Sequence, residues 1–230
     1  MRISGTILAV AIAACVWPSA VRGEPPAKDG VEKIDIFEAG KDGYALYRIP
    51  GIVATANGTL LAYCEARKSD RGDWGPIDIV LRRSTDHGKT WEARQTIAHE
   101  GAKVPKNPAA LKQKLAIEGT PPTANNPVLI ADKKPGVVHF LYCVEYSRCF
   151  YARSTDDGKT FSKPKDITEA FEPLRKKYDW QVVATGPAHG IQLKNGRLVV
   201  PVWLSLGTGG HAHRPSVVTT VFSDDGGENW

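Results

Sequence analysis

The sequence lacks a block of like charge, and it lacks an apolar run long enough to cross a bilayer as an ordinary helix. The apolar stretch near the N-terminus, Ile7–Val16, is too short for that role. The formal net charge of the 230 residues is only +5, which gives no reason to expect nucleic acid as a partner. These features argue against a basic nucleic-acid-binding tail and against a membrane-spanning helix.

Cysteine is also scarce, and its four copies show no metal-binding spacing. There is no Cys-x-x-Cys pair and no cluster of His and Cys, so we expect neither a metal site nor a cofactor. The segment HFLYCVEYSRCFYARS is typical of a hairpin that turns near Tyr146 and sets Cys143 opposite Cys149. A disulfide there and three free buried thiols, Cys64 included, are both compatible with the sequence.

The N-terminus has the features of a signal peptide: a positively charged start, the apolar stretch Ile7–Val16, and small residues after it. Cleavage is expected after Gly23, with Ala20 as the alternative. Removal of residues 1–23 takes away two arginines, lowers the formal net charge from +5 to +3 and leaves no transmembrane segment. We therefore expect a secreted or periplasmic protein, with a bacterial lipoprotein anchored through Cys15 as the alternative.

Three octapeptides share the pattern Ser-x-Asp-x-Gly-x-x-aromatic: STDHGKTW, STDDGKTF and SDDGGENW. They begin at Ser84, Ser154 and Ser223, so their starts lie 70 and 69 residues apart. In such an Asp-box, Ser and Asp side chains bond nearby backbone groups and hold a turn, while Gly supplies a positive φ. Each box follows a strand-like run, so we expect it to join two strands of a small antiparallel sheet. The structural residues of the boxes are Ser84, Asp86, Gly88, Trp91, Ser154, Asp156, Gly158, Phe161, Ser223, Asp225, Gly227 and Trp230.

Much of the remaining chain alternates strand-like runs with turn signals such as ANGT, KNGR and KKPG. Short helix is expected only at Ala110–Glu118 and Ile167–Lys177. Repeated small antiparallel sheets predict an all-β fold, a β-propeller over residues 24–230. At about 50 to 70 residues per blade the chain supplies about three to four blades, so we expect the propeller to be incomplete at its C-terminus. Further strands are predicted at Gly51–Ala56, Thr59–Glu65, Val128–Ile130, Val137–Val144, Gln181–Ala184, Gly190–Leu193 and Arg197–Leu204.

Charged side chains gather in the segment YRIPGIVATANGTLLAYCEARKSDRGDWGPID. Arg48 and Arg67 lie beside two strand-like runs of this segment. Cations and carboxylates placed together at strand ends suit either a charged surface or a site for an acidic substrate. The carboxylates of its Gly-rich end are Asp70, Asp73 and Asp78.

From Tyr47 to Trp230 the chain resembles the exo-sialidases, or neuraminidases, whose fold is a six-bladed β-propeller. The likeness rests on YRIP, EAR with its Gly/Asp loop, IDIVLRRSTDHGKTW, NNPVLI, GPAHGIQL and the three Asp-boxes. The boxes alone are weakly specific, since unrelated propellers carry them, whereas the Arg-Ile-Pro element and the Arg with its loop Asp are much more specific. The resemblance implies an exo-α-sialidase that hydrolyses terminal sialic acid from glycoproteins, glycolipids and oligosaccharides.

The resemblance also assigns roles to individual residues. Arg48 of RIP matches one of three arginines that clamp the sialic acid carboxylate, which a guanidinium fork binds through two parallel bonds. Arg67 matches the arginine that contacts a ring hydroxyl near the sugar's 4-position, and an ion pair with Glu65 or a loop aspartate is compatible with that role. The general acid/base is an aspartate of the following loop, which the spacing assigns to Asp73 in preference to Asp70.

Other positions of the resemblance are less specific. Asn126 falls where the family places an Asp or Asn near the 4-hydroxyl and N-acyl group, and Pro127 is expected to hold it extended. A plain strand-start Asn fits the sequence as well. Asp78, which lies between two isoleucines, is expected to pair structurally on its strand. His189 is expected to be a structural hydrogen-bonding residue, and the two histidines of GTGGHAHRP, residues 207–215, do not make a metal site.

The family's reaction retains configuration and uses a tyrosine nucleophile that a neighbouring Glu activates. In the family pattern that Tyr, the Glu and two further clamp arginines lie beyond the third Asp-box, so we expect the nucleophile beyond residue 230. No tyrosine of this chain sits in a matching motif, and the 230-residue chain by itself is predicted to hydrolyse no sialoside. Two other interpretations are a non-catalytic Asp-box propeller that binds glycans or proteins, and another propeller glycosidase, which would have no use for the RIP arginine.

Overall fold

The computed structural model describes residues 32–70, 72–98, 104–187 and 189–230, and Asp35–Trp230 form one compact unit. The expected signal peptide, its cleavage site and Cys15 lie outside the described residues. Within the described ranges, no helix is long and apolar enough to cross a membrane.

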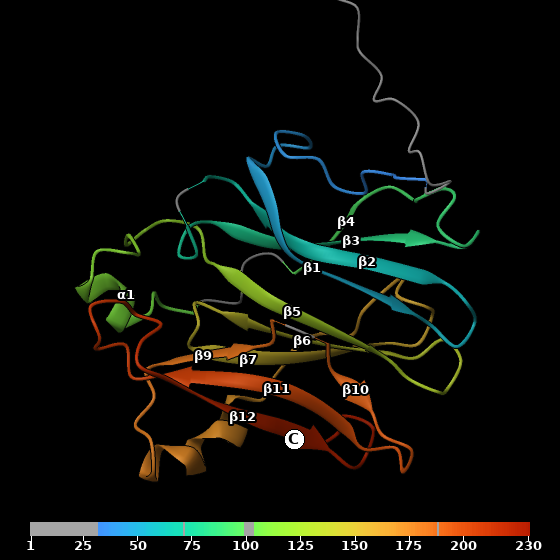
Figure 1. Cartoon of the computed structure of the whole chain (residues 1–230). Coiled ribbons are helices and arrows are strands. Elements are labelled where there is room, and N and C mark those ends of the chain that lie inside the picture. The colour runs from blue at the N-terminus through green and yellow to red at the C-terminus, as the bar shows by residue number, and fades with distance from the viewer. Residues whose placement is uncertain (1–31, 71, 99–103, 188) are drawn as a thin grey trace, which may run out of the picture. The chain divides into compact units, whose positions relative to one another are not determined.

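Three four-stranded antiparallel sheets follow one another along the described chain (Figure 1). The first contains β1 (Leu46–Ala54), β2 (Leu60–Arg67), β3 (Ile77–Ser84) and β4 (Gln95–Ala98). The second contains β5 (Ala124–Ala131), β6 (Val138–Val144), β7 (Arg148–Ser154) and β8 (Lys165–Asp166). In the third, β9 (Val182–Thr185) and β10 (Ile191–Gln192) both pair with β11 (Leu198–Ser205), which also pairs with β12 (Ser216–Ser223). The predicted all-β class and the predicted small antiparallel sheets are confirmed.

Helix is confined, in the described ranges, to α1 (Pro108–Lys112) and to the 3-10 helix η1 (Thr168–Lys176). The prediction of helix at Ala110–Glu118 is wrong in its bounds, because Lys114 takes a φ of 58° and cannot continue a right-handed helix. The second predicted helix forms as η1, whose Pro173 lacks the N–H that a regular α-helix needs at an interior position.

The second sheet is buried on both faces. Successive side chains of a strand point to opposite sides, so one strand can contribute to two cores. On β6, the even-numbered residues from Val138 to Val144 pack in a core with the first sheet. Leu141 and Cys143, between them, pack in a second core with the third sheet and η1. The two cores therefore join successive sheets in chain order.

The Asp-boxes form nearly identical turns at the ends of β3, β7 and β12. In the first box the Ser84 hydroxyl donates to Asp86 at 2.8 Å and accepts from the Gly88 N–H at 2.9 Å. Asp86 also accepts from the N–H of Thr90 at 2.9 Å and from its hydroxyl at 2.6 Å. The same four bonds recur at Ser154, Asp156, Gly158 and Thr160. Four equivalent bonds form at Ser223, Asp225, Gly227 and Asn229, where the side-chain amide of Asn229 donates in place of the threonine hydroxyl. The sixth residue after each box Ser therefore belongs to the turn, a position that the sequence pattern did not include.

The second and third boxes also contact the preceding sheet. In the second box, the Arg83 side chain of β3 donates to the carbonyl of Asp157 at 2.9 Å, and Asn57 donates to the Asp157 carboxylate at 2.7 Å. In the third, the hydroxyl of Tyr151 on β7 donates to the carbonyl of Gly226 at 3.3 Å. Each of these two boxes therefore holds its own turn and fastens its sheet to the one before.

We call β1, β5 and the β9–β10 segment the inner strands, because each forms one edge of its sheet and they contact one another. They share a feature that the sequence analysis missed: a residue of positive φ followed by proline. On β1 and β5 it coincides with a register shift, between Arg48 and Gly51 and between Asn125 and Val128. In the third sheet it lies between β9 and β10. A β-branched residue such as Ile49 is strained at positive φ by roughly 1–3 kcal/mol, so the surrounding sheet must hold it there. The three pairs are Ile49 (φ 55°) with Pro50, Asn126 (φ 54°) with Pro127, and Gly186 (φ 67°) with Pro187.

The predicted hairpin around Tyr146 joins β6 to β7 and places Cys143 directly opposite Cys149. The N–H and C=O of Cys149 bond Thr168 and Ile167, on the far side of β7 from β6. The two cysteines therefore occupy a non-hydrogen-bonded position of the ladder, where opposing side chains approach most closely. Both are buried free thiols, as is Cys64, in agreement with the second of the two alternatives that the sequence left open.

Candidate active site

Glu65 and Arg67 lie two residues apart at the end of β2, so their side chains project from the same face of the first sheet. Both are buried, and the guanidinium donates to Glu65 Oε2 from Nη2 at 2.6 Å and from Nε at 3.1 Å. A buried charge requires such a partner, because the desolvated ion is otherwise very costly. Arg67 is therefore held in one orientation by the strand that carries it.

Asp73, in the loop between β2 and β3, meets both predicted arginines. Arg67 Nη1 lies 2.8 Å from Asp73 Oδ1 and also donates to the Gly72 carbonyl at 3.0 Å. Arg48 Nη1 approaches the same Oδ1 at 3.7 Å. The side chains of Arg48 and Asp73 are 54% and 34% exposed, so a ligand can reach both. The structure thus brings Arg48, Arg67 and Asp73 together.

The other aspartates of this segment lie in different settings. Asp78 on β3 accepts from the Tyr44 hydroxyl at 2.6 Å and lies 3.5 Å from the Lys68 ammonium, which matches its expected structural pairing. For Asp70, the described residues provide no ion pair with Arg48 or Arg67. Of the two candidates for the acid/base, Asp73 is therefore the one that the loop presents to the arginines.

Asn126 is buried beside this cluster, and its conformation differs from the prediction. Its φ is 54°, so the expectation that Pro127 holds it extended is wrong. Three bonds fix it: its N–H donates to Glu65 Oε1 at 2.9 Å, its carbonyl accepts from the Thr185 hydroxyl at 2.6 Å, and its Oδ1 accepts from Asn125 at 2.9 Å. These bonds outweigh the local preference of a residue before proline. Asn126 thereby links the first and second sheets through Glu65, and its contact with a sugar stays a prediction.

Behind Asp73 lies an aromatic cluster drawn from all three sheets, formed by Trp74, Tyr146, Trp203 and His213. The ring centroids of Trp74 lie 4.5 Å from Tyr146 and 5.3 Å from His213. His213 Nδ1 lies 3.9 Å from Asp73 Oδ2, whereas both arginines approach Oδ1. Burial lowers the pKa of His213 to about 4, so the imidazole is neutral near pH 7.

Tyr146 is the tyrosine of this cluster, and it feels the charges of Glu65 and Asp73. Its burial, together with the charges of Glu65 and Asp73, raises its pKa well above the ordinary value of 10. A tyrosine nucleophile needs the opposite, because the phenolate is the attacking form. Tyr146 is therefore a neutral structural phenol and not a nucleophile.

Tyr146 and His213 carried no local signal in the sequence. Tyr146 was visible only as part of a hairpin turn, and His213 only as one of two histidines in a Gly-rich loop. Neither pattern indicates a function: Tyr146 is an aromatic residue within a turn, and His213 is a histidine two residues before a proline. Their relevance comes from the meeting of loops that lie far apart in the sequence.

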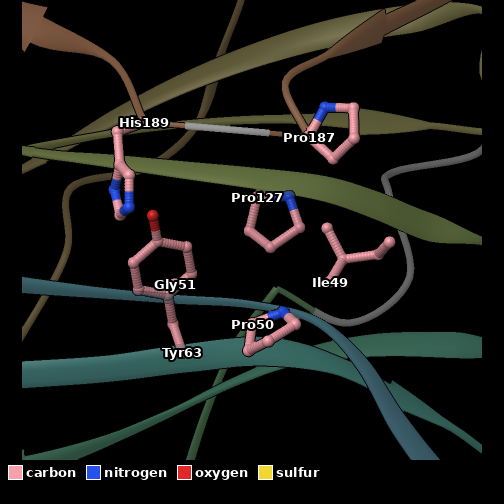
Figure 2. Close-up of a pocket in the computed structure, with 7 residues that line it drawn as sticks. All are labelled: Ile49, Pro50, Gly51, Tyr63, Pro127, Pro187 and His189. Atoms are coloured by element: carbon pink, nitrogen blue, oxygen red, sulfur yellow. The ribbon is translucent and has the colours of Figure 1, made fainter.

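A small pocket of about 170 Å³ lies between the inner strands (Figure 2). It is lined by the prolines of all three inner strands and by the aromatic ring of Tyr63 (Figure 2). Gly51 is required beside it, since any Cβ there would collide with that ring. Neither arginine nor Asp73 lines the pocket, so the charged cluster is a separate, more exposed site. The lining residues are Ile49, Pro50, Gly51, Tyr63, Pro127, Pro187 and His189.

Comparison with known proteins agrees with this architecture. Residues 49–230 match the BNR repeat-like domain family. A sialidase of Bacteroides fragilis (strain YCH46) is 29% identical over 228 residues, which cover 89% of this chain and 38% of the relative. An exo-alpha-sialidase of Arthroderma benhamiae is 29% identical over 172 residues, covering 69% of this chain and 41% of the relative. The chain thus spans about two fifths of the length of these relatives.

Solved structures give the same result. The Hadza microbial sialidase Hz136 is similar with a TM-score of 0.64 at 27% identity, over 84% of this chain and 38% of that one. Trypanosoma rangeli sialidase in complex with sialic acid, at 21% identity and a TM-score of 0.57 over 81% of this chain and 30% of that one, shows the fold alone. The repeated sheets and their boxes define part of a β-propeller of the Asp-box class. The chain belongs to the BNR repeat-like domain family, and the relatives and solved structures that it resembles are sialidases.

Proposed function

We propose that the full-length protein is a retaining exo-α-sialidase acting on sialylated glycans, and that this chain supplies part of its active site. The observation that carries the proposal is the convergence of Arg48 and Arg67 on one oxygen of the half-exposed Asp73. A cation that is 54% exposed and only 3.7 Å from a carboxylate is available to an incoming acid. The sialidase relatives support the choice of sialic acid as that acid.

The two arginines have different tasks in this proposal. Arg67 has four donor contacts, two to Glu65, one to Gly72 and one to Asp73, which leave one N–H of its five for a sugar hydroxyl. Its main task is to hold the Asp73 loop. Arg48 has its fork largely free, so it binds the sialic acid carboxylate and exchanges its weak contact with Asp73 for that bond.

Asp73 is then the general acid and base. In its protonated form it transfers a proton to the glycosidic oxygen while the bond from that oxygen to the anomeric carbon breaks, and the electron pair of the bond stays on the oxygen. The nucleophile that bonds to the carbon is a tyrosine phenolate by the family resemblance, a role that Tyr146 does not fill. Water, deprotonated by the Asp73 carboxylate, then releases the sugar with net retention.

Hydrolysis of sialyllactose by the full-length protein tests this function. Asp73→Asn should lower kcat by about 100-fold or more, since general acid–base catalysis contributes 10²–10⁴-fold. Asp70→Asn, in the same loop, is the matched control and should leave kcat within about threefold. Full activity in Asp73→Asn would refute the assignment. Sialoside binding by the wild type without any turnover would favour the non-catalytic Asp-box propeller instead.

We also propose export, secreted or periplasmic, on the strength of the N-terminal pattern. N-terminal sequencing of the mature protein should begin at Glu24, and a chain that retains residues 1–23 would contradict the proposal. A mature chain that begins at a lipid-modified Cys15 would establish the alternative anchor.

A further inference from the structure

The two carboxylate oxygens of Asp73 face different chemical groups. Both arginines approach Oδ1, Arg67 at 2.8 Å and Arg48 at 3.7 Å. Oδ2 faces the imidazole of His213, whose Nδ1 lies 3.9 Å away. A guanidinium has only donors, so a proton on Oδ1 would meet the N–H hydrogens of the arginines and find no acceptor. The oxygen that can carry a proton without this conflict is Oδ2, because a neutral imidazole offers an acceptor.

His213 comes from a distant part of the chain and is held firmly where it meets Asp73. It lies in the loop between β11 and β12, and its side chain is only 18% exposed. Its ring centroid lies 5.0 Å from that of Tyr146 and 5.1 Å, edge-on, from that of Trp203. Its backbone N–H donates to His211 Nδ1 at 3.2 Å. The imidazole therefore cannot turn away from Asp73 without leaving this aromatic packing.

Further bonds fasten the loop on either side of His213. The Ser205 hydroxyl donates to the Ala212 carbonyl at 3.0 Å and accepts from the Gly207 N–H at 3.0 Å. The Gln113 side chain, just after α1, donates to the Gly207 carbonyl. The loop is thus tied both to its own strand and to a segment before the second sheet, as expected of an element that positions another group.

The titratable groups around His213 set its protonation state. Burial has the largest effect, and the Asp73 carboxylate opposes it. The result is an imidazole that stays neutral at the pH where a glycosidase of this kind works, so it accepts a bond and does not add a third cation. The groups that face it or its partner are Asp73, His211 and Tyr146, with Arg48, Arg67 and Glu65 beyond Asp73.

We propose that His213 is a positioning residue for the general acid, fixing the Asp73 carboxyl so that Oδ2 is the oxygen that carries and delivers the proton. His213 Nδ1 accepts the hydrogen bond of that proton until the glycosidic oxygen takes its place, and the proton then moves from Oδ2 to the glycosidic oxygen. His213 ends the step as the neutral imidazole with which it began. The 3.9 Å separation closes in this state, as catalytic contacts commonly tighten when substrate is bound. This inference rests on the proposed role of Asp73.

Two substrates separate this role from a purely structural one. Sialyllactose has a poor leaving group that must be protonated as it departs, whereas an aryl sialoside with an acidic phenol leaves with little help. In the full-length enzyme, His213→Phe keeps an aromatic ring in the cluster and removes both ring nitrogens. We expect kcat on sialyllactose to fall about 10- to 100-fold and kcat on the aryl sialoside to change less than about threefold.

Two further variants complete the design. His213→Asn places an amide where Nδ1 lies, so it should restore part of the lost kcat on sialyllactose. His87→Asn, at an exposed position of the first Asp-box turn with a φ of 61°, is the matched control and should change neither kcat, since Asn tolerates that conformation. His213→Phe should unfold no more easily than the wild type, because Nε2 is a buried nitrogen without a partner among the described residues.

Each outcome decides the matter. An equal loss on both substrates, or an unchanged kcat on sialyllactose, in a His213→Phe enzyme with wild-type thermal stability would overturn the positioning role while leaving the proposed sialidase function in place. Wild-type protein that hydrolyses neither substrate would instead overturn the proposed function, and the role of His213 with it. A loss of kcat confined to sialyllactose, with partial rescue by His213→Asn, supports both the positioning role of His213 and the proposed sialidase function.

Discussion

Gly158 of the second Asp-box offers a sharp test of how the sheets are fastened together. Its φ is 75°, and a Cβ added there would lie 2.9 Å from Leu61 Cδ1 of the first sheet. The conformation costs an L-residue roughly 1–2 kcal/mol. Overpacking of a buried contact adds roughly 1–3 kcal/mol. Gly158→Ala should therefore lower the free energy of unfolding by about 2–5 kcal/mol.

Gly196, in the turn between β10 and β11, is the matched control. Its φ is 93°, and a Cβ added there would meet nothing within 4 Å. Gly196→Ala should thus cost only the conformational part, roughly 1–2 kcal/mol. In a background with Leu61→Ala, the atoms that obstruct the new methyl group are gone. The added cost of Gly158→Ala in that background should then fall to that of Gly196→Ala.

Urea denaturation of the full-length protein, followed by tryptophan fluorescence, measures these differences. The four proteins needed for the cycle are the wild type, the two single variants and the double variant at Gly158 and Leu61. A Gly158→Ala variant that costs no more than Gly196→Ala would show that the box does not pack against the preceding sheet. A cost that persists unchanged when Leu61 is truncated would refute the same reasoning.

The remaining predictions concern the site, pH and thiols. Arg48→Lys should raise the KM for a sialoside at least about tenfold with a smaller change in kcat, because an ammonium cannot form paired bonds to a carboxylate; an unchanged KM in steady-state kinetics would contradict the clamp. From pH 6.5 down to about 4 the fold should lose stability, since burial holds the folded-state pKa of His213 at about 4 and only the unfolded chain binds the proton there; urea midpoints of His213→Phe should fall less. As the pH falls from about 4 through 2, stability should drop again, because hydrogen bonds from the Asp-box lower the pKa of Asp86 to about 2, and Asp86→Asn should weaken that dependence. Mild thiol oxidation should remove two hydrogen atoms by joining Cys143 to Cys149, and intact mass of Cys149→Ser should stay unchanged.

Sequence and structure agree at the Asp-boxes, where the signal was local. The Ser, Asp and Gly of each box form the turn that their side chains predict, since every bond spans only a few residues. The family resemblance assigned Arg48, Arg67 and Asp73, and they lie together because β1 and β2 are neighbours in one sheet and the loop that carries Asp73 follows β2 directly. The position of His213 was not predictable in the same way, because the loop between β11 and β12 reaches the loop between β2 and β3 only once the second sheet has packed against the other two. No periodicity within one segment records that arrangement.

Of the two misjudged positions, Asn126 shows how tertiary bonds override local preference. Asn126 precedes a proline, which favours an extended backbone, yet Glu65 and Thr185 hold it at positive φ. Lys114 also takes a positive φ, but there the bonds are local: the N–H of Lys114 donates to the Leu111 carbonyl and that of Leu115 to the Ala110 carbonyl, which closes the end of α1. For Asn126, by contrast, the partners come from other parts of the chain. The partners of Asn126 lie on the first and third sheets, which places this correction beside the candidate site.

The prolines of the inner strands limit the hydrogen bonding that another strand could form with these strands. An inner strand is the edge of its sheet, and an unprotected edge offers a row of N–H and C=O groups to any other strand. β1 and β5 contact each other but belong to different sheets. Pro50 and Pro127 remove a donor from each edge at the point where the strand already bulges. The residue of positive φ followed by proline, which lines the pocket near the candidate site, therefore also hinders hydrogen bonding between the inner strands of neighbouring blades.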